Sequence, residues 1–336
     1  MKELSMQTAR TAIVCYEDRT EWLISVKLLA LSLAEHSPNL PILLYAPEAV
    51  IPDAFREWVT RNAPLVEIRP APSECMTGWS AKPFVLIDAL EKGCDQAIWI
   101  DADIMVTKPI EPRFFDLPPN VLSTAPEARG FNPDRAAVWG FNVIRPLAVG
   151  INSSVLRCTS HHLSILRKWA QLMQTSKYTD AQKMNYSDRP SILFGDQDVL
   201  EGLLISDAMQ PADPPPLDQL ENGGEIIHGT ALPAPKIFSL SRVLPMFVHA
   251  IGLKPWHLQY IDKHSRRRIK YVQLELSLYA LLARKYKTQL EEAKVETWIN
   301  PKTPFGQACD ILTFSHPYLR QAPLMTYTRL GARFGW

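Results

Sequence analysis

Two aspartates separated by a single alanine follow a short apolar run. The run Ala97-Ile-Trp-Ile100 is typical of a buried strand, and Asp101-Ala102-Asp103 comes directly after it. In an extended chain residues i and i+2 face the same way, so the two carboxylates are expected to point together. Such a pair repels by roughly 4 kcal/mol at an effective dielectric near 20, so a compensating cation is expected beside it. Oxygen ligands suit Mg²⁺ or Mn²⁺, and the competing interpretation is a D-x-D sequence that caps a loop.

A second candidate segment lies far along the chain, in His249-Ala-Ile-Gly252-Leu-Lys254-Pro-Trp256. A neutral imidazole shifts the preference of an oxygen site from Mg²⁺ towards Mn²⁺. Gly252 permits close approach of the backbone to a ligand, and Lys254 is a point charge suited to a phosphate. The alternative for His249 is a hydrogen-bonded core histidine within an apolar run.

A third segment, Gly195-Asp196-Gln197-Asp198, precedes an apolar helical pattern that continues to Leu204. Aspartate before such a pattern is a preferred helix N-cap, and it is also an acid that a helix start can present to a ligand. The residues alone leave both interpretations open for Asp196.

The elements that must position these residues alternate between strands and helices. Such alternation favours a mainly parallel sheet with helices on both faces, in which ligands bind outside the carboxyl ends of the strands. Neither G-x-G-x-x-G after the first strand nor a P-loop sequence is present, which disfavours a dinucleotide fold and a P-loop NTPase. The expected strands are 11–16, 41–45, 65–68, 97–100, 121–124 and 150–156, with β-prone segments at 225–228 and 236–238, and the expected helices are 21–36, 55–62, 82–92, 160–174, one from 195 onward and a long one through 272–298.

Composition excludes several classes of protein. The 336 residues are 46% hydrophobic with a net charge of +1, which is ordinary for a globular protein and gives no reason to expect nucleic acid as a partner. No apolar run approaches the ~18 residues of a membrane-spanning helix, and the first eleven residues lack the apolar core of a signal peptide. Five scattered cysteines without a C-x-x-C pair are typical of reduced thiols. A cytoplasmic protein is therefore expected.

Taken together, the D-x-D, Asn152-Ser153, the D-Q-D segment and H-x-x-G-x-K-P-W resemble the glycogenin-like retaining glycosyltransferases of family 8. The resemblance covers about 11–257. It implies the GT-A fold, an α/β Rossmann-like arrangement with a mixed, mainly parallel sheet. Two departures stand out: one residue, where the family usually has two, separates Gly252 from Lys254, and Ser154 occupies a position that is commonly glycine.

By this resemblance the donor is a nucleotide-diphosphate sugar, most often a UDP-sugar, with Mn²⁺ (or Mg²⁺) bridging the diphosphate. The implied metal ligands are Asp101, Asp103 and His249, and the implied diphosphate contacts are Gly252 and Lys254. The remaining roles implied by the family match are a nucleotide-base wall at Tyr16 and Glu17, a contact near the sugar at Asn152, a pair beside the anomeric carbon at Asp196 and Gln197, and a basic residue reaching the donor at Lys82. A retained anomeric configuration requires either a covalent intermediate on Asp196 or front-face attack by the acceptor.

The domain organisation expected from this pattern is a GT-A catalytic domain over 8–262 and a C-terminal helical extension over 263–336. That extension is basic and aromatic, so it either docks on the inner face of an anionic membrane or packs on the core. The acceptor is an unidentified glycan, glycolipid or protein. Two rival functions remain: a catalytically inactive sugar-nucleotide-binding protein, and a sugar-1-phosphate nucleotidyltransferase, which the missing Gly-rich basic loop after the first strand disfavours.

Overall fold

The computed structural model describes residues 10–127, 130–209, 214–219, 226–228, 244–252, 254–260, 274, 277–291, 295–300 and 303–312. The chain divides into two compact units, each built from separate stretches of sequence. The first unit comprises 1–23, 37–102 and 110–225, and the second comprises 24–36, 103–109 and 226–336.

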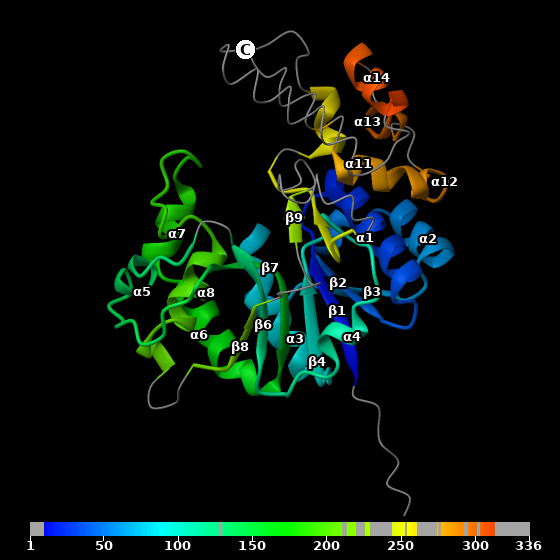
Figure 1. The fold of residues 1–336 in the computed structure, drawn as a ribbon. Coiled ribbons are helices and arrows are strands. Elements are labelled where there is room, and N and C mark those ends of the chain that lie inside the picture. Colours follow the sequence, from blue (N-terminus) through cyan, green and yellow to red (C-terminus); the bar gives the residue numbers. More distant parts are fainter. Residues whose placement is uncertain are drawn as a thin grey trace, which may run out of the picture. The chain divides into compact units, whose positions relative to one another are not determined.

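A seven-stranded sheet forms the centre of the first unit, in the order β3-β2-β1-β4-β7-β6-β8 (Figure 1). The pairs β3–β2, β2–β1, β1–β4 and β6–β8 are parallel, whereas β7 runs antiparallel to both β4 and β6. The mixed, mainly parallel sheet expected from the sequence is confirmed. The strands are β1 (Thr11–Tyr16), β2 (Ile42–Ala46), β3 (Val66–Pro70), β4 (Gln96–Ile100), β6 (Leu122–Glu127), β7 (Gly150–Thr159) and β8 (Leu217–Gln219).

Helices α2, α3, α6 and α8 of the first unit follow the predicted ranges closely, whereas α4 and α7 were not predicted. The segment 127–140, expected to be a loop, contains the short helix α5, and β8 was not expected at all. The α-helices are α2 (Asp53–Asn62), α3 (Lys82–Glu91), α4 (Glu111–Phe114), α5 (Asp134–Ala137), α6 (Leu163–Met173), α7 (Ser176–Lys183) and α8 (Asp196–Leu204). The 3₁₀ turns are η1 (Thr20–Trp22), η2 (Glu48–Val50), η3 (Gly78–Ala81), η4 (Ser160–His162) and η5 (Asp207–Met209).

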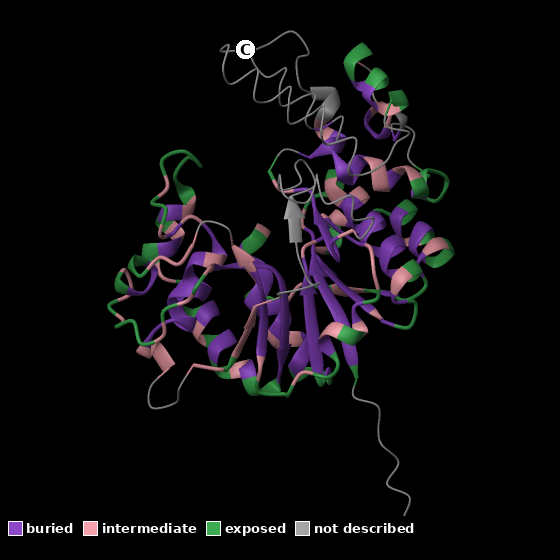
Figure 2. Ribbon diagram, in the orientation of Figure 1, coloured by how far each residue is buried: buried purple, intermediate pink, exposed green. Residues whose placement is uncertain are grey.

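The core of the first unit lies where α3, α6 and α8 meet the central strands. Strands β1, β4 and β7 are buried along their whole length (Figure 2). Their side chains join Val85, Leu86, Trp169, Leu200 and Leu203 from the three helices in one apolar cluster. Burial of apolar surface stabilises a protein by roughly 25 cal/mol per Å². This core therefore holds β4 and β7, which pair next to Asp101, firmly in place.

The second unit holds a smaller sheet of three strands in the order β5-β10-β9, with β10 antiparallel to β5 and parallel to β9. These strands are β5 (Ile104–Val106), β9 (Ile226–His228) and β10 (Phe247–His249). The helical elements are α1 (Leu23–His36), nearly all of which belongs to this unit, and η6 (Pro255–Tyr260), α11 (Leu278–Ala283), η7 (Arg284–Tyr286), α12 (Lys287–Leu290), α13 (Glu296–Ile299) and α14 (Pro304–Leu312).

The prediction of one long helix through 272–298 is wrong for the described residues of that stretch. The pattern is divided into α11, a 3₁₀ turn, α12 and α13. Helix α12 ends at Leu290 because Glu291 adopts φ 52°, and a residue in this left-handed conformation cannot continue a helix. The β-prone segment 236–238, the basic run 266–270 and the aromatic tail from 313 lie outside the described residues. Among the described residues, none of the helices has the length and hydrophobicity needed to cross a bilayer.

Candidate functional site

The two aspartates of the D-x-D do not lie in an extended strand. Strand β4 ends at Ile100, a turn at Ala102 and Asp103 follows, and β5 begins at Ile104. Strand alternation is therefore the wrong reason for expecting the two carboxylates together. The turn itself brings them together: one ligand atom from each of Asp101, Asp103 and His249 lies within 4.8 Å of the others.

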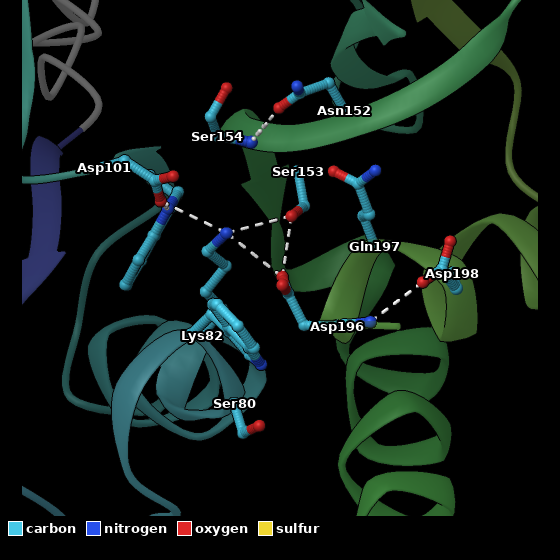
Figure 3. Close-up of polar contacts among 12 residues, drawn as sticks. Ser80, Lys82, Asp101, Asn152, Ser153, Ser154, Asp196, Gln197 and Asp198 are labelled. Carbon is cyan, nitrogen blue, oxygen red and sulfur yellow. Dashed lines mark hydrogen bonds and ion pairs between the residues drawn. The ribbon is translucent and has the colours of Figure 1, made fainter. Parts of the chain in front are cut away.

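On the first unit, Asp101 belongs to a buried polar group that we call the Lys82 cluster (Figure 3). The Lys82 ammonium lies 3.2 Å from Asp101 Oδ1 and 3.1 Å from Asp196 Oδ2, and it donates to Ser153 Oγ at 2.9 Å. The Ser153 hydroxyl donates in turn to Asp196 Oδ2 at 2.6 Å. One lysine thus joins acids from two segments that are far apart in the sequence.

Each member of the Lys82 cluster is placed by the end of a regular element. Lys82 opens α3, Asp196 opens α8, and Ser153 lies on β7 next to the carboxyl end of β4. Only 3% of Lys82 is exposed. Burial acts against the charged ammonium, but the carboxylates of Asp101 and Asp196 outweigh it and raise the pKa of Lys82 above its ordinary value. Lys82 is therefore a permanent cation between two acids.

The two acids of the D-Q-D segment have different partners. Gly195 is the N-cap of α8, and its backbone N–H donates to Asp198 Oδ2 at 2.8 Å, while Asp198 Oδ1 lies 2.8 Å from the Arg135 guanidinium. Asp198 therefore fulfils the local capping role. The N-cap interpretation of Asp196 is wrong, because its carboxylate is directed to Lys82 and Ser153.

On the second unit, Asp103, His249 and Lys254 form the Asp103 cluster. Asp103 Oδ1 lies 3.1 Å from His249 Nε2, and Asp103 Oδ2 accepts a hydrogen bond from the Lys254 ammonium, which also donates to Ala250 O. The Ala250 N–H donates to Asp103 O at 3.0 Å, which locks this segment to the turn. Burial would raise the pKa of Asp103, but Lys254 and His249 hold it well below its usual range.

Gly252 is required for a different reason from the one expected. Its φ is 73°, a backbone conformation that residues other than glycine rarely adopt. A Cβ added at this position would meet no atom within 4 Å. The residue thus allows the chain to turn between His249 and Lys254. Open space around it is compatible with the predicted phosphate contact.

The two lysines change the argument for a metal ion. Sequence reasoning expected a bound cation because paired acids repel, yet Lys82 and Lys254 already supply positive charge to Asp101 and Asp103. The case for a metal therefore rests on the donors: two carboxylates and one imidazole in reach of one point are a ligand set that fits Mn²⁺. Lys254 Nζ and an ion would share the same carboxylate of Asp103.

Four other predicted residues lie on the first unit. Tyr16 ends β1, and the buried carboxylate of Glu17 accepts from the Arg19 side chain at 2.7 Å and from two backbone N–H groups of its own loop. Asn152 Oδ1 accepts from the Ser154 N–H at 2.9 Å, and Gln197 Nε2 donates to Glu127 Oε2 at 3.4 Å.

Sequence reasoning missed two members of the site. Ser153 was noted only as part of a motif, and the Trp99 indole N–H, which donates to Asp101 Oδ1 at 2.7 Å, was treated only as strand core. Ser153 could have been found as a polar residue inside an apolar strand, and Trp99 as a tryptophan two positions before an acid.

No family model matches the chain, and no curated protein is found as a relative. Among solved structures, the bifunctional glycosyltransferase WbbM matches with a TM-score of 0.50 at 11% identity over 87% of this chain and 51% of WbbM. The chain has the GT-A fold of glycosyltransferases. The glycosyltransferase GlyE of Streptococcus pneumoniae TIGR4 matches with a TM-score of 0.44 at 19% identity, over 83% of this chain and 64% of GlyE. The galactosyltransferase LgtC, in complex with donor and acceptor sugar analogues, matches with a TM-score of 0.45 at 16% identity, over 83% of this chain and 99% of LgtC.

The chain therefore spans about half the length of WbbM and less than two thirds of GlyE, whereas it corresponds to nearly all of LgtC. At 11% identity the likeness to WbbM concerns the fold alone, and it agrees with the GT-A arrangement that the sequence motifs imply.

Proposed function

We propose that this protein is a retaining glycosyltransferase of the glycogenin-like family 8, which transfers a sugar from a nucleotide-diphosphate donor, most often a UDP-sugar, to a hydroxyl acceptor. The observation that carries the proposal is the turn after β4, where Asp101 meets the Lys82 cluster and Asp103 meets His249 and Lys254. In a sheet of this kind ligands bind at the carboxyl ends of the strands, which is where this turn lies.

Donor binding is assigned to residues on both sides of the turn. Asp101, Asp103 and His249 would hold a divalent cation, Mn²⁺ for preference, and such an ion supplies positive charge to a departing nucleoside diphosphate. Lys254 adds a second positive charge, and Gly252 leaves room for a phosphate beside it. Tyr16 and Glu17 are assigned to the nucleotide base and Asn152 to the sugar, as the family resemblance implies.

The chemical step is assigned to the residues at the start of α8. The Lys82 ammonium lies 3.1 Å from Asp196 Oδ2, and a carboxylate beside the anomeric carbon stabilises the positive charge that develops there as the bond to phosphate breaks. Gln197 is one residue further and, in front-face attack, steadies the oxocarbenium-like centre. Retention follows by double displacement on Asp196 or by front-face attack, in which the departing phosphate takes the acceptor proton, and both routes require Asp196 to be charged.

The proposal is tested by measuring release of nucleoside diphosphate from a panel of labelled UDP-, GDP-, ADP- and dTDP-sugars with Mn²⁺, with Mg²⁺ and with EDTA. We expect slow hydrolysis of one donor, loss of the activity in EDTA, and a fall of at least about a hundredfold in Asp103→Asn. Asp180→Asn, which changes a surface acid paired with Lys183, is the matched control. NMR of the anomeric proton of the first-formed product tests retention.

The rival function is an inactive sugar-nucleotide-binding protein, because the shortened segment places Lys254 on Asp103 rather than leaving it for a phosphate. Calorimetry with the same donors distinguishes the two. Binding of a donor without turnover, with sugar acceptors present, would refute the enzyme and support the binding protein.

A further inference from the structure

An exposed group of aromatic side chains adjoins the Lys82 cluster on the first unit. Trp79 is 42% exposed and Tyr186 is 61% exposed, which is unusual for side chains of this size. The Arg189 guanidinium lies 5.4 Å from the centre of the Trp79 ring and 6.0 Å from that of Tyr186. Phe194 supports Tyr186 edge-on at 4.3 Å between ring centroids. We call these four residues the Trp79 platform.

The Trp79 platform is held in place by hydrogen bonds that leave its rings at the surface. Arg189 donates to the side chain and backbone oxygens of Gln182, each at 2.9 Å, and the Trp79 indole N–H donates to the same Gln182 side chain at 3.3 Å. Gln182 in turn donates to Leu193 O at 2.9 Å. Fixed aromatic rings lose little conformational freedom when they bind a partner, so this arrangement is pre-organised for binding.

Two of the four chain segments that supply the Lys82 cluster, those of Lys82 and Asp196, follow directly after platform residues. Trp79 lies in η3, three residues before Lys82, and Phe194 precedes Asp196 by two residues. The Trp79 ring packs against Gly195, where an added Cβ would lie 3.9 Å from the indole. The platform is therefore connected through Gly195, the preceding residue, to Asp196, the acid that we assign to the anomeric carbon.

We propose that the Trp79 platform docks a sugar ring of the acceptor, so that the acceptor is a saccharide. The inference rests on the proposed function, because it needs Asp196 to mark the reaction centre. The apolar C–H face of a pyranose matches an exposed aromatic surface, whose ring electron density is negative. Arg189 is already bonded to carbonyl oxygens, so the surface is not built for an anion.

The test uses the full-length protein and saturation-transfer NMR with free methyl glycosides of glucose, galactose, mannose and N-acetylglucosamine, and with lactose and maltose. We expect at least one of them to bind, and its Kd to rise roughly tenfold in Trp79→Leu and in Tyr186→Ala, as truncation of an aromatic anchor does. Phe115→Ala is the matched control, since Phe115 is a 46% exposed aromatic of the same unit outside the platform. Melting temperatures establish that each variant is folded.

Donor hydrolysis is measured on the same samples, so that the two proposals fail separately. No saccharide binding by the folded wild-type protein, or binding that the platform variants leave unchanged, overturns the docking inference even where donor hydrolysis is found. Platform-dependent saccharide binding without turnover of any donor supports the docking surface and contradicts the enzymatic function. With an active enzyme, the ratio of transfer to hydrolysis falls about tenfold in Tyr186→Ala.

Discussion

Strands β4 and β7 carry buried polar groups at both ends, and the two ends are built differently. At the end where β4 finishes, Lys82 faces Asp101, Asp196 and the Ser153 hydroxyl. At the opposite end Arg157 donates to Gln96 Oε1 at 2.6 Å and to three backbone carbonyls. One end pairs charged side chains with one another, whereas the other pairs a charge with neutral oxygens.

The opposite end, which we call the Arg157 network, fastens the loop before β6. Arg157 donates to the carbonyl oxygens of 117, 118 and 121 at 2.8–2.9 Å, and Thr159 Oγ1 donates to the carbonyl oxygen of 119 at 2.6 Å. His162 Nδ1 accepts from the Thr159 N–H at 2.9 Å. Backbone carbonyls cannot leave without unfolding the loop, so this network is structural, while side-chain charges can exchange partners with a ligand.

The largest expected effect is a loss of donor turnover on changing Asp196 at the site end. Asp196→Asn keeps the shape of the side chain but removes the charge that we assign to the anomeric carbon, so donor turnover should fall roughly a thousandfold to ten-thousandfold, or about 4 to 5 kcal/mol. Lys82 keeps Asp101 as a partner, so the free energy of unfolding should change by less than about 2 kcal/mol. Urea titration and single-turnover kinetics measure both. A variant that loses stability instead of turnover would assign Asp196 to the structure, as we have assigned Asp198.

The second effect is a loss of stability on changing Arg157 at the opposite end. Arg157→Met removes a donor from the Gln96 side chain and from three carbonyls, of which Pro118 O still accepts from the Val121 N–H. The free energy of unfolding should therefore fall by about 3 to 4 kcal/mol. Turnover per folded molecule should not change. Arg167→Met is the matched control, because Arg167 lies on the surface of α6 with its side chain 60% exposed, and its loss should be within about 1 kcal/mol. A fall in turnover without a fall in stability would contradict the division between the two ends.

Much of the site end could be predicted from sequence because local patterns determine it. The apolar run before Asp101 predicts the strand and places the acid at its carboxyl end. The apolar residues after Asp196 predict α8. The pairing of Asp196 with Lys82 could not be predicted, because it depends on how β7 and two helices pack, and nothing in either segment encodes the other.

Two failures share one physical cause. Asp101 and Asp103 were expected to point together by strand alternation, and 272–298 was expected to be one helix, but turns interrupt both segments. Hydrophobic periodicity reports which residues are buried and not where the backbone changes direction. Glu291, whose side-chain type gives no turn signal, adopts a positive φ, so a sequence pattern had no means of placing that break.

The smallest expected effect is the titration of His162, which belongs to the Arg157 network. Burial lowers the pKa of His162 to about 4, from an ordinary value of 6.5, and the charge of Arg157 acts in the same direction. The native protein therefore binds this proton less readily than the unfolded chain. The stability that neutral His162 provides is complete above pH 6.5 and is lost as the pH falls towards 4, a difference of about 3 kcal/mol at about 1.4 kcal/mol per pH unit.

His162→Asn tests this, because an asparagine Oδ1 can still accept from the Thr159 N–H but does not titrate. Between pH 6.5 and 4, the free energy of unfolding of the wild-type protein should fall by about 3 kcal/mol more than that of His162→Asn. His161→Asn, a change of the neighbouring exposed histidine, is the matched control and should follow the wild type. Parallel pH profiles for the wild type and His162→Asn would mean that His162 accepts a proton without breaking its bond to Thr159. The Arg157 network would then accommodate an additional charged side chain, and the two ends would not differ in this respect.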